Sequence, residues 1–277
     1  MTTLQATMLG IVQGLTEFLP VSSSGHLVLA QSIMGIEPGV TFDLGVHVGT
    51  AFAVLAVYGR DVVRIIAGLF RGILRRDGSA RLALCLFITS IPAAMVGLLA
   101  GDAVESAFAS PAFVGGGLIL SGFVLWCSDR LMAGSPRRSK RGGSSGCSMS
   151  YGQAFEVGVG QALAVFPGVS RSGLTIASGV GVGLERSFAA TYSFIASLPV
   201  IAGAAVLWPI RNGSGIASAD LRFIATGALA SFVSGVVAIA LLRKLIQQAR
   251  LRVFAYYLWA VGTATILWTA RGLLLGK

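Results

Sequence analysis

The chain has 277 residues, of which 55% are hydrophobic and only 12% are charged, and its formal net charge is +10. A soluble domain carries about 25% charged residues, so this composition, with a mean hydropathy of +0.81, excludes an ordinary soluble protein. Apolar runs of about 16 to 22 residues have the length that crosses a bilayer. The sequence therefore predicts a single all-α polytopic membrane domain over residues 1–277.

The first apolar stretch, residues 1–35, is interrupted by the polar sequence QGLTEFLPVSSSGH at 13–26. Pro20 and the serines after it are typical of one helix ending and another beginning. Irregular backbone at membrane depth is tolerated only where protein or a water-filled cavity surrounds it. We therefore expect residues 1–35 to form a re-entrant helical hairpin that lines a cavity.

Six plain transmembrane helices are predicted in the rest of the chain. They cover residues 42–58, 82–100, 112–127, 188–209, 221–242 and 253–270. A short stretch with Asp102 and Glu105 joins the second and third of them.

Three clusters of basic residues lie between these helices. The clusters are Arg60, Arg64, Arg71, Arg75, Arg76 and Arg81; Arg130, Arg137, Arg138, Lys140 and Arg141; and Arg243, Lys244, Arg250 and Arg252. Such loops are typical of the cytoplasmic side, where some arginines also meet anionic lipid head groups. The net positive charge is thereby explained by membrane topology, and we expect no nucleic-acid partner.

A Gly/Ser-rich segment divides the chain into two halves, and we expect a flexible cytoplasmic linker over residues 133–150. The first repeat covers residues 1–132 and the second residues 151–277. The second half begins with another broken apolar stretch, residues 151–183, which Pro167 and Gly168 interrupt. We expect this stretch to be a second re-entrant hairpin.

The two broken stretches are internal repeats. Residues 10–25, GIVQGLTEFLPVSSSG, align without a gap with residues 158–173, GVGQALAVFPGVSRSG, and eight of the sixteen positions are identical. Three predicted helices lie between them, and an odd number inverts the second copy. We therefore predict an inverted-topology repeat whose hairpin tips meet near the membrane midplane, with both termini outside.

Two charged residues lie in these tips. Glu17 follows Gln13 by four residues, so both side chains project from one helix face, and Arg171 occupies the position aligned with Ser23. A charge at membrane depth is costly and indicates a functional site. A guanidinium also suits phosphate oxygens. The alternative is a Glu17–Arg171 salt bridge that only holds helices together.

The remaining candidates are small polar residues and a histidine. Helix N-termini at the tips would bind phosphate, which makes substrate-binding candidates of Ser22, Ser24, Ser170, Ser172 and Gly173. Gln13, on the same helix face as Glu17, is a further substrate-binding candidate. Capping and helix packing are the alternative for most of the serines. Ser23 is the candidate nucleophile, and His26 is the candidate proton carrier. His47 lacks polar neighbours in sequence, and we expect a supporting or structural role.

QxxxE followed by FLPVSSSGH, and PGVSRSG in the second half, resemble the undecaprenyl-diphosphate phosphatase family, also called the bacitracin-resistance family. Further similar segments are FDLGVHVGTAFAVL and ERSFAATYSFIASLP. The resemblance implies a multi-pass protein of the bacterial inner membrane that removes the terminal phosphate of the C55 polyprenyl diphosphate, with an active site on the periplasmic side. It also implies Glu17, Ser23, His26 and Arg171 as catalytic residues and a divalent cation, Mg²⁺ or Ca²⁺, at Glu17 and Gln13.

Two positions depart from the family pattern. Relatives often carry Glu where this chain has Gln13, and an amide oxygen can ligate Mg²⁺ or Ca²⁺ but adds no charge. Relatives usually carry Gln where this chain has His47. The leading alternative function is a polyprenyl-phosphate flippase that binds the same head group without cleaving it. The sequence leaves open whether the chain forms a homo-oligomer.

Overall fold

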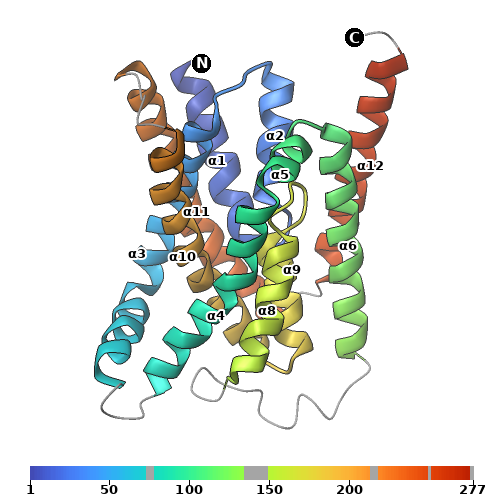
Figure 1. The fold of residues 1–277 in the computed structure, drawn as a ribbon. Coiled ribbons are helices and arrows are strands. Elements are labelled where there is room, and N and C mark those ends of the chain that lie inside the picture. The colour runs from blue at the N-terminus through green and yellow to red at the C-terminus, as the bar shows by residue number, and fades with distance from the viewer. Residues whose placement is uncertain (73–77, 134–148, 213–217, 249–250, 275–277) are drawn as a thin grey trace.

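The computed structural model describes residues 1–72, 78–133, 149–212, 218–248 and 251–274, and this part of the chain is entirely helical (Figure 1). Most of the predicted linker, residues 134–148, lies outside the described residues. The helices are α1 (Thr3–Phe18), α2 (Ser23–Met34), α3 (Val40–Gly72), α4 (Gly78–Leu99), α5 (Gly101–Phe108), α6 (Pro111–Ala133), α8 (Tyr151–Leu163), α9 (Arg171–Gly181), α10 (Arg186–Asn212), α11 (Ser218–Gln248) and α12 (Arg252–Leu274).

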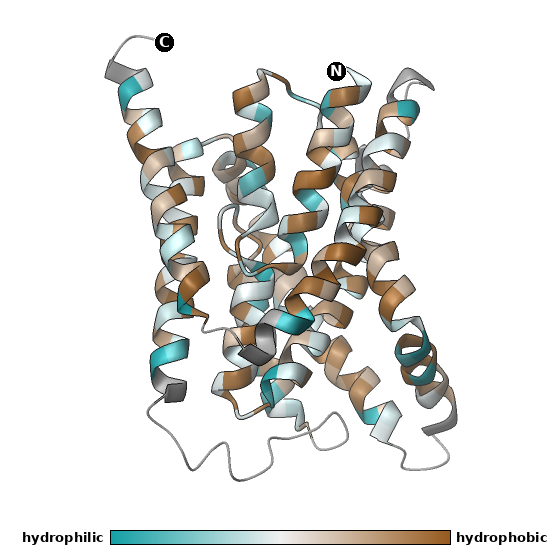
Figure 2. Cartoon of the chain, turned by 180° about the vertical axis from the view of Figure 1, so that it is seen from behind, coloured by the Kyte–Doolittle hydropathy of each residue, from teal (hydrophilic) through white to brown (hydrophobic). Residues whose placement is uncertain are grey.

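Six of these helices, α3, α4, α6, α10, α11 and α12, are long and apolar enough to cross a membrane. This confirms the six predicted spans. Figure 2 shows apolar residues along the length of these helices. Many of their large apolar side chains face outward, including Phe52, Phe87 and Leu99. Outward apolar faces of this kind suit contact with lipid rather than water.

Two segments differ from the prediction. Helix α3 has 33 residues and continues past residue 58, so Arg60 and Arg64 lie on a helix rather than in a loop. The apolar residues Val62, Ile65, Ile66 and Leu69 recur with helical spacing, which favours continuation of the helix. The stretch with Asp102 and Glu105 forms the eight-residue helix α5, which is too short to leave a clear hydrophobic period in the sequence.

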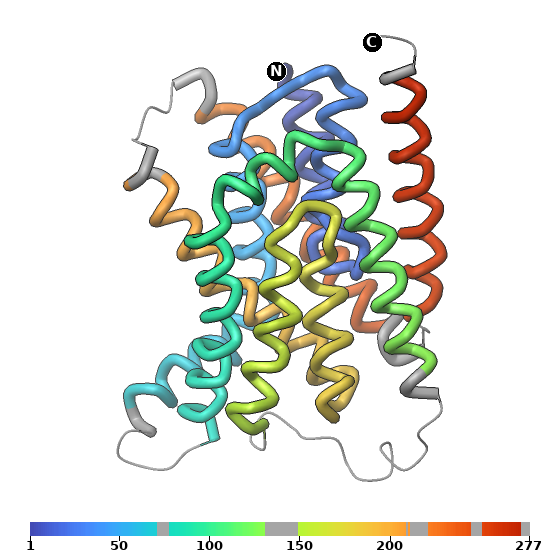
Figure 3. Tube along the Cα trace, turned by 45° about the vertical axis from the view of Figure 1, so that its right-hand side comes forward, coloured from blue at the N-terminus to red at the C-terminus, as the bar shows by residue number. Residues whose placement is uncertain are grey.

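Two helix pairs have turns inside the bundle. The α1–α2 pair runs from the end where both termini lie toward the middle and back, whereas the α8–α9 pair comes from the opposite end (Figures 1 and 3). Helix α1 ends at Phe18, and α2 begins at Ser23 with Ser22 as its N-cap. Helix α9 begins at Arg171 after the N-cap Ser170. Both apolar stretches are therefore broken at the predicted Pro and Ser positions.

The two turns are in direct contact. The Ser172 hydroxyl donates to the backbone oxygen of Leu19 at 2.9 Å. A Cβ atom added at Gly25 would lie 3.2 Å from the Cα atom of Gly168, so the backbones approach each other closely. Beneath the first turn, Phe18 packs edge-to-face on Phe194 with ring centroids 5.4 Å apart. The fold thus brings the polar segments of both halves to one place.

Each helix pair packs against the other half of the chain. Helix α1 packs on α11, and α8 packs on α4. Helices α6 and α12 form a further close pair. The second turn rests on α6, where a Cβ atom at Gly117 would lie only 2.6 Å from the backbone oxygen of Pro167. The absence of a side chain at Gly117 therefore sets how deeply this turn sits in the bundle.

We expect Gly117→Ala to destabilise the protein, because the added methyl group collides with the Pro167–Gly168 backbone. Overpacking of this kind costs about 1 to 3 kcal/mol. The measurement is thermal unfolding of the purified protein in detergent.

Gly116→Ala is the matched control, since a Cβ atom at Gly116 has no neighbour within 4 Å. This neighbouring change should leave the unfolding temperature the same or raise it, because Ala favours helix over Gly by about 1 kcal/mol. Equal stability of the two variants would contradict the close packing of the second turn on α6.

Candidate active site

Glu17 is the centre of the polar cluster between the two turns. It lies in the last turn of α1, and its side chain is only 5% exposed. Gln13, one helical turn earlier and fully buried, donates from Nε2 to Glu17 Oε2 at 2.8 Å. The Ser23 hydroxyl donates to the same oxygen at 2.5 Å. Both predicted neighbours, Gln13 and Ser23, therefore contact the carboxylate.

Arg171 reaches the same carboxylate from the other half of the chain. Its Nη2 atom pairs with Glu17 Oε1, and its Nη1 atom donates to the backbone oxygen of Ser193 at 3.0 Å. The Arg171 side chain is 18% exposed. A buried ion pair persists only when further hydrogen bonds satisfy both partners, and here Ser23, Gln13 and Ser193 supply them.

The two turns cap their helices with the same contacts. Ser22 Oγ accepts from the backbone N–H of Gly25 at 3.3 Å and lies 3.4 Å from Ser24 Oγ. Ser170 Oγ accepts from the backbone N–H of Gly173 at 3.1 Å and lies 3.4 Å from Ser172 Oγ. The capping role therefore holds for Ser22 and Ser170. The N-termini of α2 and α9, which carry positive partial charge, begin at these two caps.

The structure separates the predicted catalytic residues into two groups. Glu17, Ser23 and Arg171 form one connected cluster. His26 instead contacts the backbone oxygen of Ser22 through Nδ1 at 2.8 Å and the Tyr257 hydroxyl through Nε2 at 2.7 Å. Among the hydrogen bonds of the described residues, none joins the His26 ring to Ser23 or Glu17. The prediction placed His26 beside these residues, and the structure turns its ring toward α12.

His47 is closer to the cluster than its sequence surroundings indicate. Its Nε2 atom lies 3.8 Å from Glu17 Oε2, while Nδ1 contacts the backbone oxygen of Asp43 at 2.7 Å. From the sequence, a supporting or structural role is expected for His47, but the apolar residues around it on α3 do not indicate which residue it contacts. Tyr257 on α12 was not predicted at all, since it lies in an ordinary apolar span 231 residues from His26.

The oxygen atoms at this site limit what cation it can hold. Within the described residues, no group of three or more His, Cys, Asp or Glu side chains could bind a metal ion. The cluster does offer the Glu17 carboxylate and Gln13 Oε1, which is buried and has no hydrogen-bond partner in the described part of the chain. Mg²⁺ is commonly held by one or two protein oxygens together with substrate phosphates. The donors therefore fit a cation that substrate phosphates also ligate.

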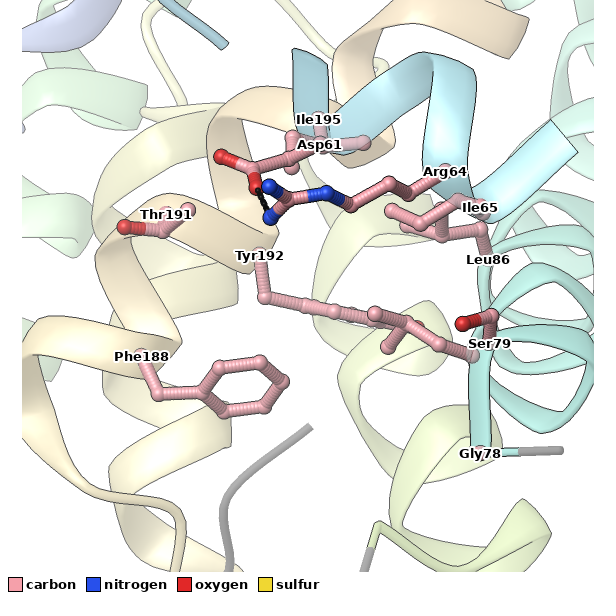
Figure 4. Close-up of a pocket in the computed structure, with 11 residues that line it drawn as sticks. Asp61, Arg64, Ile65, Gly78, Ser79, Leu86, Phe188, Thr191, Tyr192 and Ile195 are labelled. Carbon is pink, nitrogen blue, oxygen red and sulfur yellow. Dashed lines mark hydrogen bonds and ion pairs between the residues drawn. The ribbon is translucent and has the colours of Figure 1, made fainter. Parts of the chain in front are cut away.

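A separate cavity of 290 Å³ lies between α3, α4 and α10 (Figure 4). Asp61 and Arg64, paired at 3.3 Å, lie at one wall, and Phe188 and Tyr192 lie at another. None of the predicted site residues lines this cavity. The cluster around Glu17 remains the candidate active site, because it alone combines the predicted charges with two helix N-termini.

Comparison with known proteins gives consistent matches over nearly the whole chain. The family described as "Bacitracin resistance protein BacA" matches residues 6–264. The "Undecaprenyl-diphosphatase" of Desulforapulum autotrophicum is 39% identical, and that of Methanosphaera stadtmanae is also 39% identical. The "Undecaprenyl-diphosphatase" of Desulfosudis oleivorans is 41% identical. Each of the three matches covers 95% of this chain and 97% of the relative.

We expect Glu17→Gln and Arg171→Met to be strongly coupled in stability. Either change alone leaves a buried charge without its partner, which costs about 3 to 5 kcal/mol. The double variant leaves no such charge, so its loss should be clearly smaller than the sum of the two. The measurement is the free energy of unfolding in mixed micelles for all four proteins.

Asp61→Asn and Arg64→Met provide the matched control cycle. Their side chains are 51% and 75% exposed, and exposed pairs contribute only about 0 to 1 kcal/mol. Additive losses at Glu17 and Arg171, like those expected for the control pair, would show that the two charges are not a buried pair.

Proposed function

Because the chain belongs to the family of bacitracin resistance protein BacA, we propose that its Glu17–Arg171 cluster is the active site of an undecaprenyl-diphosphatase. The enzyme hydrolyses undecaprenyl diphosphate to undecaprenyl phosphate and phosphate, which recycles the lipid carrier for cell-wall synthesis. The observation that carries this assignment is the buried Glu17–Arg171 pair, with Ser23 on the same carboxylate, between two helix N-termini.

The α1–α2 and α8–α9 pairs act as re-entrant hairpins of an inverted repeat. Three features support this. The caps at Ser22 and Ser170 make the same contacts, the α1 contact with α11 is matched by that of α8 with α4, and the α3 contact with α11 is matched by that of α10 with α4. A two-fold relation between residues 1–132 and 151–277 predicts these pairings, because it exchanges α1 with α8 and α11 with α4.

The active site opens to the periplasm, and both termini lie on that side. Arg130, Arg243 and Lys244 lie near the C-terminal ends of α6 and α11, which are opposite the end of the bundle with the termini (Figure 1). Arg60 and Arg64 lie in the C-terminal half of α3, which runs to the same end, and basic residues favour the cytoplasmic side. The α1–α2 hairpin, which carries Glu17, Ser23 and His26, enters from the other side. The prenyl tail remains in the surrounding lipid while the diphosphate reaches the two turns.

Hydrolysis begins with the diphosphate bound at the N-termini of α2 and α9. Arg171 and the backbone N–H groups there stabilise the negative charge on the phosphoryl oxygens in the transition state. Glu17 Oε2 accepts a hydrogen bond from the Ser23 hydroxyl and orients it. Either Ser23 attacks the terminal phosphorus, its proton passing to Glu17, and water then hydrolyses the phosphoserine, or Ser23 positions the water that attacks directly. On both routes the bond from the terminal phosphorus to the bridging oxygen breaks, and undecaprenyl phosphate leaves. His26 provides the site where a proton is held and exchanged with solvent or the leaving phosphate.

The scheme accommodates a divalent cation that oxygen atoms of both the protein and the substrate would ligate. Glu17 and the unpaired Gln13 Oε1 would hold it on the protein side, and it would neutralise phosphate charge when bound. Because Glu17 is already paired with Arg171, the protein by itself offers little net negative charge to a cation. A cation would therefore bind chiefly together with the diphosphate.

The alternative, a polyprenyl-phosphate flippase without hydrolysis, is not favoured, since the curated relatives are named as diphosphatases. We expect purified protein to release phosphate from undecaprenyl diphosphate, and Arg171→Ala and Glu17→Ala to lose at least about 100-fold in rate, as for other oriented charge-stabilising groups. Added EDTA should lower the rate, and Mg²⁺ or Ca²⁺ should restore it.

Arg64→Ala, on the exposed part of α3, is the control and should keep the wild-type rate. Substrate binding without phosphate release by the wild-type protein would favour the flippase instead. In the same assay, trapping of a phosphoserine at Ser23 would establish the covalent route, whereas full activity of Ser23→Ala would eliminate it.

We expect Gln13→Glu to lower the cation concentration needed for half-maximal phosphate release. A second carboxylate beside Glu17 adds negative charge at the oxygen atoms assigned to the cation, and charge count tunes cation affinity. A cation titration of activity, run in parallel on wild type and on Gln13→Ala, provides the measurement. An unchanged half-maximal concentration in Gln13→Glu would place the cation away from residue 13.

A further inference from the structure

The environment of His26 fixes which ring nitrogen carries its proton. Nδ1 lies 2.8 Å from the backbone oxygen of Ser22, an atom that can only accept a hydrogen bond. Nδ1 of the neutral ring must therefore be the protonated nitrogen. The lone pair is then on Nε2, which faces the Tyr257 hydroxyl at 2.7 Å, and the phenol is the donor in that contact.

The backbone at Ser22 is shaped for this contact. Ser22 has φ of 69°, the only positive φ outside glycine in the described residues. Positive φ is strained for a residue with a side chain. The Ser22 carbonyl accepts both the backbone N–H of His26 at 3.2 Å and its ring Nδ1. The strained cap thus holds the histidine ring from one side.

Tyr257 holds the ring from the other side. The two rings are nearly parallel, with an interplanar angle of 7° and centroids 5.6 Å apart, and the hydrogen bond joins their edges. Tyr257 comes from α12, in the second half of the chain, whereas His26 lies in the first turn of α2. The contact is therefore a further link between the halves, separate from the Glu17–Arg171 pair.

We propose that Tyr257 is the positioning residue for His26: its hydroxyl donates to Nε2, the proton-accepting nitrogen that the Ser22 contact leaves, and holds the ring plane toward α12. This inference rests on the proposed hydrolysis, in which His26 exchanges a proton. In this proposal, two separate groups handle protons, the Ser23 hydroxyl and the His26 ring. The Ser23 hydroxyl faces Glu17, and the His26 lone pair faces the side of α2 that lies toward α12.

A phenol that acts through histidine has a kinetic signature. Tyr257→Phe retains the aromatic ring and removes only the hydroxyl, so substrate binding should change little while proton handling suffers. We expect kcat for phosphate release to fall about tenfold, with KM within about twofold of wild type, because the lost interaction acts on the chemical step rather than on binding.

Tyr256→Phe is the matched control. Tyr256 is the preceding residue on α12, and its ring packs against Trp259 at 5.8 Å. The Tyr256→Phe variant should keep the wild-type kcat and KM. Thermal unfolding of both variants separates catalysis from folding, since a merely structural Tyr257 would lower stability and leave kcat of the folded protein unchanged.

Imidazole ¹⁵N NMR tests the contact without relying on activity. The chain has two histidines, so the His47→Gln background leaves only His26. In that background, Tyr257→Phe should shift the Nε2 resonance of neutral His26, and Tyr256→Phe should not. Wild-type kcat in Tyr257→Phe, or an unchanged Nε2 resonance, would overturn the inference. Absence of phosphate release by the wild type would refute the proposed function instead, and the NMR result would stand by itself.

Discussion

The buried ion pair between Glu17 and Arg171 is the interaction on which the rest of the structure depends. Charges inside an apolar bundle are costly unless they are paired and hydrogen-bonded, and these two come from segments 154 residues apart. They meet only because α1 stops at Phe18 and α9 starts at Arg171, each inside the bundle. Three features bring the two turns together. They are the serine caps, the close approach of Gly25 to Gly168, and the packing of α1 on α11 and of α8 on α4.

The same arrangement explains how an apolar bundle can handle a diphosphate. Two helix N-termini and one guanidinium provide positive charge, while Glu17 keeps Arg171 neutralised until an anion arrives. Ser23 shares the Glu17 carboxylate, so in the proposed mechanism a phosphate that binds Arg171 also changes the environment of the hydroxyl. His26 is held between Ser22 and Tyr257 and takes no part in the contacts among Arg171, Glu17 and Ser23. Binding of substrate and handling of protons are thus assigned to neighbouring but distinct groups.

Much of this was predictable from the sequence, because breaks and charges in apolar runs are rare and informative. Pro20, the serine cluster and the aligned segments at 10–25 and 158–173 predicted where the helices end, and Glu17 and Arg171 marked the site. The short helix α5 and the continuation of α3 through Arg64 were missed, since neither has a sharp hydrophobic boundary. His47 and Tyr257 were missed as neighbours of the site because their proximity depends on how α3 and α12 are rotated, which local patterns do not encode.

The most direct measurement of the central claim is disulfide formation between the two turns. A Cβ atom at residue 173 would lie 3.4 Å from the Cβ atom of Pro20, close to the roughly 3.5 to 4.5 Å found between bridged cysteines. It would also lie 2.9 Å from the Ser170 hydroxyl, which must shift to admit it. Pro20→Cys combined with Gly173→Cys, with Cys85, Cys127 and Cys147 replaced, should cross-link rapidly under mild oxidation in native membranes. Failure to cross-link, while each single cysteine still reacts with a thiol reagent, would show that the two turns do not meet.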